Sequence, residues 1–124
     1  MADLARHFAE AARREGERVA LVTPQGAESF AGIDRRAAAF AARCTARGLG
    51  KGDRVLIAMP VGVDLYVALA ACWRLGAVAV FPEPAMGIAG LRHAVALTRP
   101  KCLFASGRYR LLRLLPALWR CPVL

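Results

Sequence analysis

Several side chains on which enzyme catalysis often depends are scarce in this sequence. Its 124 residues include no asparagine, two serines and two histidines. There is no G-x-S-x-G motif, so the nucleophile elbow of an α/β-hydrolase is absent. Asp53 and Asp64 flank one expected strand, where carboxylates suit capping and solvation better than acid–base catalysis. We therefore expect no catalytic, cofactor-binding or metal-binding residue in this chain.

Long segments without charge are also missing. The segments Val55–Val63 and Leu65–Trp73 have nine uncharged residues each, whereas a helix that spans a bilayer needs about 20 apolar residues. Asp3 and Glu10 lie in an N-terminus that lacks the apolar centre of a signal peptide. An apolar content of 57% and a mean hydropathy of +0.39 exclude disorder. The expectation is one cytoplasmic globular domain without a transmembrane segment.

The four cysteines do not form a C-x-x-C pair, and their sequence separations are wide: they are Cys44, Cys72, Cys102 and Cys121. Zinc sites place ligands two to four residues apart, so a zinc site is not expected. Each cysteine lies among apolar residues, which favours buried free thiols over disulfides.

Acidic residues are absent from the last third of the chain. The net charge is +9; residues 1–85 contain 11 Lys or Arg and 9 Asp or Glu, and residues 86–124 contain seven Lys or Arg and no acid. Such a segment suits nucleic acid, anionic lipid or an acidic partner. The basic segment has no aromatic platform on which bases could stack and no known nucleic-acid-binding motif, so we do not expect nucleic-acid binding. Acidic sequence beyond Leu124 would balance this charge in a longer protein.

The hydrophobic pattern predicts alternating helices and strands. Helices are expected at 3–15, 31–47, 63–75, 87–98 and 108–118, and strands at 19–22, 28–30, 54–59, 77–81, 101–105 and from 122. Repeated strand–helix–strand units imply right-handed crossovers and a parallel sheet. The prediction is an α/β fold: part of a doubly wound, mostly parallel sheet with flanking helices, preceded by a helix and a short hairpin. We expect a truncated domain, because the chain stops inside an expected strand.

Two segments have alternative interpretations. The glycine-rich segment Gly48–Asp53 resembles a phosphate loop, but it follows a helix and precedes a strand, so a helix C-cap and a tight turn are favoured. Residues 108–118 could form an amphipathic helix at a membrane surface, with Leu111, Leu114, Leu115 and Leu118 on one face. A crossover helix packed on the sheet is favoured there, and His93 is expected at the surface.

Four segments carry a family resemblance. Ser29–Arg36 (SFAGIDRR) resembles the pattern T-Y-x-E-L-D, and Arg47–Val55 (RGLGKGDRV) contains G-x-x-x-G-D-R-V. Met59-Pro60 and Trp73–Pro82 (WRLGAVAVFP) continue the match. Together they resemble the N-terminal part of adenylate-forming enzymes, the superfamily of acyl-CoA synthetases and AMP-binding ligases.

The departures from the family pattern are few. Gly32 stands where the family usually has Glu, Val61 where Asn is common, and Glu83 differs from the P-x-D-P pattern. Pro84–Gly87 and Arg99–Lys101 resemble the branch of fatty acyl-AMP ligases and olefin β-lactone synthetases.

The resemblance implies that residues 1–124 are an N-terminal α/β subdomain of an ATP-dependent ligase, which activates a carboxylic acid, such as a fatty acid, as an acyl-adenylate. The acyl group then passes to CoA or another nucleophile. The family's phosphate loop and its adenine, magnesium and lysine motifs have no match here, so ATP and Mg²⁺ are expected only for the full-length enzyme. The remainder of the ligase is the expected partner. The alternative is a non-catalytic basic module that binds anionic lipid or nucleic acid through residues 86–124.

Overall fold

The structure, a computed structural model, describes residues 3–116. At its centre lies a parallel sheet with strand order β4-β3-β5, formed by β3 (Arg54–Ala58), β4 (Val78–Val80) and β5 (Cys102–Ala105). The described α-helices are α1 (Leu4–Arg14), α2 (Phe30–Ala46), α3 (Val63–Leu75) and α4 (Gly87–Thr98). An antiparallel hairpin comprises β1 (Val19–Thr23) and β2 (Gly26–Ser29). Two 3₁₀-helices are η1 (Pro84–Met86) and η2 (Gly107–Leu114).

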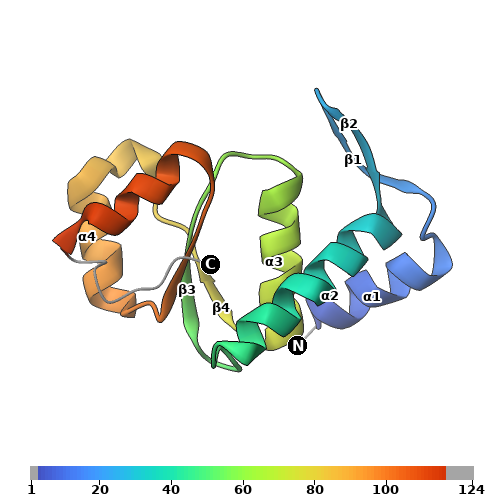
Figure 1. Ribbon diagram of the computed structural model, residues 1–124, viewed down its shortest axis with the longest axis horizontal. Coiled ribbons are helices and arrows are strands. Elements are labelled where there is room, and N and C mark those ends of the chain that lie inside the picture. Colours follow the sequence, from blue (N-terminus) through green and yellow to red (C-terminus); the bar gives the residue numbers. More distant parts are fainter. Residues whose placement is uncertain (1–2, 117–124) are drawn as a thin grey trace.

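Helices lie on both sides of the parallel sheet. Figure 1 shows α2 and α3 on one side of the strands and α4 on the other. The connection from β3 to β4 crosses the sheet in one direction, and the connection from β4 to β5 crosses back past β3. Right-handed crossovers that run in opposite directions place their helices on opposite faces. The predicted doubly wound α/β fold is confirmed, as are the N-terminal helix and the hairpin.

Strand β3 is the centre of the core. Val55, Leu56 and Ile57 are each at most 2% exposed, because helices cover both faces of the sheet and neighbouring strands pair with both edges of β3. This environment explains its uninterrupted apolar sequence. On β5, Leu103 and Phe104 are fully buried beside it.

The predicted helix boundaries are confirmed to within a residue or two where local signals mark them. The Ser29 hydroxyl oxygen accepts a hydrogen bond of 3.0 Å from the Gly32 amide at the start of α2. Gly76 ends α3 in the left-handed region with φ of 69°, and Gly48 follows α2 with φ of 86°. Left-handed backbone is favourable for glycine, which lacks a Cβ.

A second apolar cluster joins α2, α3 and the N-terminal helix. Ile33 and Ala37 of α2 pack against Val67 and Ala70 of α3. Phe8 of α1 reaches the same cluster, with its ring centroid 6.1 Å from that of Phe30 and 6.3 Å from that of Trp73. The hairpin β1–β2 extends outward from this end of the molecule (Figure 1).

The α-helix expected from residue 108 is a 3₁₀-helix instead. A 3₁₀-helix has three residues per turn, so side chains three positions apart share a face. Tyr109, Leu112 and Leu115 accordingly pack against the core. Leu111 and Leu114, expected to be buried, are 66% and 64% exposed. Leu118 and the expected strand from 122 lie outside the described residues.

Three of the four cysteines are described, and they are buried thiols that form no disulfide, as predicted: Cys44, Cys72 and Cys102. Burial, and to a smaller extent the neighbouring Cys44, raises the pKa of Cys72 to about 12. A thiol in this state is a poor nucleophile. Cys121 lies outside the described residues.

Candidate functional site

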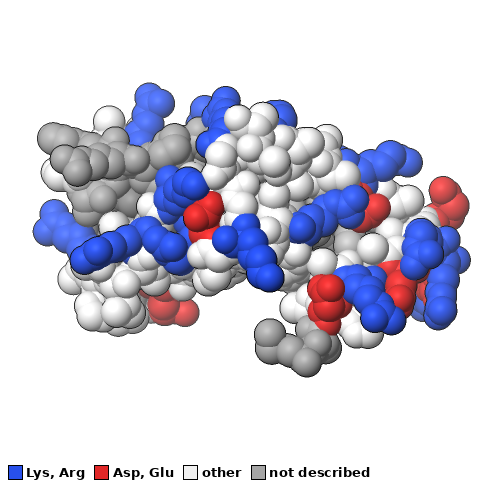
Figure 2. Space-filling model, turned by 90° about the horizontal axis from the view of Figure 1, so that it is seen from below, with Lys and Arg blue, Asp and Glu red and all other residues white. Residues whose placement is uncertain are grey.

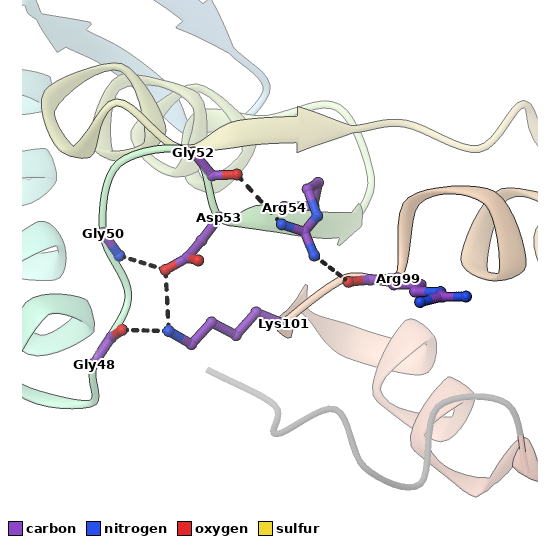
Figure 3. Close-up of polar contacts among 7 residues, drawn as sticks. All are labelled: Gly48, Gly50, Gly52, Asp53, Arg54, Arg99 and Lys101. Carbon is purple, nitrogen blue, oxygen red and sulfur yellow. Dashed lines mark hydrogen bonds and ion pairs between the residues drawn. The ribbon is translucent and has the colours of Figure 1, made fainter.

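The glycine-rich turn before β3 is closed by its own side chains. The Asp53 carboxylate accepts a hydrogen bond of 2.8 Å from the Gly50 amide, and Lys101 Nζ lies 3.1 Å from the same oxygen (Figure 3). Lys101 Nζ also donates to the Gly48 carbonyl oxygen over 2.6 Å. The Gly50 amide, which a bound phosphate would need as a hydrogen-bond donor, therefore already donates to the Asp53 carboxylate. For this reason the turn does not fit ATP. The interpretation of this segment as a C-cap and tight turn agrees with this geometry.

The Asp53 contacts predict a pH dependence. The Gly50 amide and then the Lys101 ammonium hold the pKa of Asp53 below its ordinary value. In the unfolded chain Asp53 binds a proton at a higher pH, so its contribution is complete above about pH 4 and is lost as the pH falls through the lowered pKa. Asp53→Asn is expected to be less stable than the wild type at neutral pH, with the difference shrinking on acidification.

Urea denaturation at a series of pH values checks this prediction. Glu17→Gln is the matched control, because it removes an exposed carboxylate that makes no ion pair with the residues described here. A constant difference between Asp53→Asn and the wild type down to the lowest pH would contradict the assignment.

An open pocket of about 540 Å³ lies where β3 and β5 end. Met59 follows β3, and Ala105 and Ser106 come at the end of β5. The remaining lining residues are Arg36, Ala39, Phe40 and Arg43 of α2, and Asp64, Val67 and Ala68 of α3. Open α/β sheets bind their ligands at this carboxyl edge. The pocket is therefore the candidate functional site of the described chain.

The pocket is apolar inside and positively charged at its rim. The Phe40 ring packs edge-on against Phe104, with centroids 4.8 Å apart. The Arg43 guanidinium lies over the Phe40 ring, 5.3 Å from its centroid. Arg36 pairs with Asp64 over 2.6 Å between Nη2 and Oδ1, so the pocket lining carries two guanidinium groups and one carboxylate. This arrangement suits an apolar group with an anionic end.

Among the described residues, the pocket lining has one hydroxyl group and no imidazole. Ser106 is its only described serine, and no histidine lines it. Within residues 3–116, no three His, Cys, Asp or Glu side chains are grouped to bind a metal ion.

Most residues considered from the sequence lie away from this pocket. His7 and His93 are exposed on α1 and α4, and Asp53 is at the opposite, amino edge of the sheet. Only Asp64 and Ser106 reach the pocket. Phe40 and Arg43 gave no functional signal in the sequence, and Met59 stood out only in the family resemblance, because the pocket joins segments that are far apart along the chain. No helix of the described part is long and apolar enough to cross a membrane.

The family model for AMP-binding enzymes matches residues 8–120. The chain belongs to this family. It is 37% identical over 96 residues to a salicyl-AMP ligase / salicyl-S-ArCP synthetase of Mycobacterium tuberculosis, a match that covers 73% of this chain and 17% of that protein. A 2-hydroxy-7-methoxy-5-methyl-1-naphthoate–CoA ligase of Streptomyces carzinostaticus is 33% identical over 107 residues, covering 86% of this chain and 19% of the relative.

Solved structures show the same fold. A benzoate CoA ligase from Burkholderia xenovorans superposes with a TM-score of 0.83 at 19% identity, over 99% of this chain and 25% of that one. The chain thus spans less than a fifth of the two relatives and a quarter of this structure. The predicted resemblance to adenylate-forming enzymes is confirmed. The matches do not single out the fatty acyl-AMP branch.

Proposed function

We propose that residues 1–124 are the N-terminal scaffold of an ATP-dependent ligase that activates a carboxylic acid as its acyl-adenylate. The activated acid, for which a fatty acid is one candidate, would pass to CoA or to a carrier protein. ATP and Mg²⁺ would be bound by the remainder of the ligase, and no residue of this chain would act as a catalyst. A cytoplasmic location is part of the same proposal.

The observation that carries the proposal is the family match along nearly the whole chain together with the absence of catalytic groups from the pocket. The match covers residues 8–120, and the relatives named above are acid–CoA and acyl-AMP ligases. A medium-chain fatty-acid–CoA ligase of Escherichia coli, 28% identical over 110 residues, supports a fatty acid as one candidate substrate. A scaffold explains why a ligase-like segment has a formed core and an apolar carboxyl-edge pocket with one serine and no histidine.

The alternative of a non-catalytic basic module is not favoured. The basic residues of the last third do not form one surface among the described residues, because they are divided among α4, η2 and the amino edge of the sheet. The family match offers no observation in favour of this alternative either.

A chimera tests the scaffold proposal. The matching 96-residue segment of the Mycobacterium tuberculosis salicyl-AMP ligase would be replaced by the corresponding segment of this chain. The measurement is ATP–pyrophosphate exchange driven by salicylate. We expect the chimera to retain exchange and its preference for salicylate, whereas the 124-residue chain alone shows none.

The control is the same chimera with Leu56→Asp, which places a charge in the centre of β3 and is expected to abolish exchange by unfolding the scaffold. Exchange by the isolated chain would contradict the proposal. A folded chimera without exchange, as judged by circular dichroism, would also contradict it.

A further inference from the structure

Basic side chains gather at the amino edge of the parallel sheet, opposite the pocket. The turn from α2 to β3 contributes Arg47, Lys51 and Arg54, and the turn from α4 to β5 contributes Arg99 and Lys101. Asp53 is the acid among them, so these six residues, which we call the basic edge, have a net charge of +4. Figure 2 views this end of the molecule: basic side chains are spread across the whole face, and most acidic ones lie to the right, toward α1.

Hydrogen bonds hold part of the basic edge in place. Arg54 Nε donates to the Thr98 carbonyl oxygen over 2.8 Å, and its Nη2 donates to the Arg99 carbonyl oxygen over 3.0 Å (Figure 3). Lys101 Nζ donates hydrogen bonds to the Gly48 carbonyl oxygen and to the Asp53 carboxylate. Carbonyl partners fix the direction of both cations and leave the charge of Arg54 unpaired, whereas Asp53 offsets the charge of Lys101. The two turns therefore form one rigid, positively charged surface.

The other three cations point to solvent. Arg47, Lys51 and Arg99 are exposed, and none of them forms an ion pair within residues 3–116. They are available to an anionic partner, and a guanidinium group binds phosphate with two parallel hydrogen bonds.

Exposed apolar side chains accompany the cations. Leu97, two residues before Arg99, is 75% exposed. Val78 is 48% exposed and pairs with Arg54 in the sheet register. Cations next to exposed apolar groups are typical of surfaces that lie on a phospholipid bilayer, where the cations meet headgroups and the apolar groups enter the interface.

We propose that the basic edge docks on the surface of a membrane that contains anionic phospholipid. A nucleic acid is a poorer fit, because residues 47–54 and 97–101 contain no aromatic side chain on which a base could stack. The pocket lies at the opposite edge of the sheet and stays open when the amino edge is covered. The docking surface would bring a ligase close to amphipathic acids in the bilayer, but it does not depend on ligase activity.

Vesicle co-sedimentation of the 124-residue chain tests the proposal. We expect binding to vesicles of phosphatidylcholine with phosphatidylglycerol, none to phosphatidylcholine alone, and weaker binding as salt rises. The triple variant Arg47→Gln, Lys51→Gln, Arg99→Asn is expected to lower affinity on the order of 100-fold. Asparagine is chosen at position 99 because the backbone there has a φ of 47°.

The matched control removes three exposed cations elsewhere: Arg13→Gln, Arg14→Gln, Arg35→Gln. Because attraction to the surface falls off within a Debye length, this control is expected to lose less than about threefold. Leu97→Gln tests the apolar contribution and should weaken binding to vesicles several-fold without changing the circular dichroism spectrum.

Three results would overturn the docking proposal. One is an equal loss in the two triple variants, which would show that net charge alone matters. Another is equally tight, equally salt-dependent binding to a DNA oligonucleotide, which would show unselective attraction to polyanions. The third is the absence of binding to the anionic vesicles at low salt by the folded wild-type chain. None of these results bears on the chimera, so the two proposals fail independently.

Discussion

Replacing Phe104 with alanine is expected to lower the free energy of unfolding by about 3–5 kcal/mol. Phe104 is fully buried on β5, and its ring contacts that of Phe40 on α2 with centroids 4.8 Å apart. Truncation removes apolar contacts from the sheet and from the helix that covers it, and leaves a cavity that neighbouring strands cannot fill by small shifts. Urea denaturation followed by circular dichroism measures the loss.

Two comparison variants make the Phe104 experiment specific. Phe104→Leu keeps most of the volume and is expected to cost less than about 1.5 kcal/mol. Phe81→Ala removes a ring that is 51% exposed and is expected to cost far less than Phe104→Ala. Equal losses at positions 81 and 104 would contradict the location of the core between the sheet and α2.

Enlarging Ala37 to leucine is expected to destabilise the chain by about 1–3 kcal/mol. Ala37 is fully buried on α2, in a cluster that includes Val67 and Ala70 of α3. Small side chains allow the two helices to approach closely, and a leucine there has to displace α3 or adopt a strained rotamer. Thermal unfolding by circular dichroism measures this effect.

The control for this prediction lies on the same helix. Ala42→Leu adds the same side chain at an exposed position of α2, where alanine and leucine have nearly equal helix propensity. It is expected to leave the midpoint almost unchanged. A stabilising effect of Ala37→Leu would show that the α2–α3 interface contains unfilled space.

The extent of successful sequence prediction differs among the elements. The strand expected at 54–59 and the helices expected at 31–47 and 63–75 depend on local signals, and each was predicted correctly. For the segment after β5, the predicted α-helix was wrong, because residues Gly107–Leu114 form a 3₁₀-helix. Its leucines fit both the period of an α-helix and the three-residue period of a 3₁₀-helix, and only contact of Tyr109, Leu112 and Leu115 with the core shows which period is used.

The sequence by itself determined the order of helices and strands, the parallel sheet and, through segments such as Arg47–Val55, the family. These properties depend on residues close together along the chain. Only the tertiary structure decided the strand order β4-β3-β5, the Asp53–Lys101 contact and the pocket where Arg36 meets Asp64. Such features join residues far apart in sequence, and no local pattern specifies which distant partner a side chain will meet once the chain is folded.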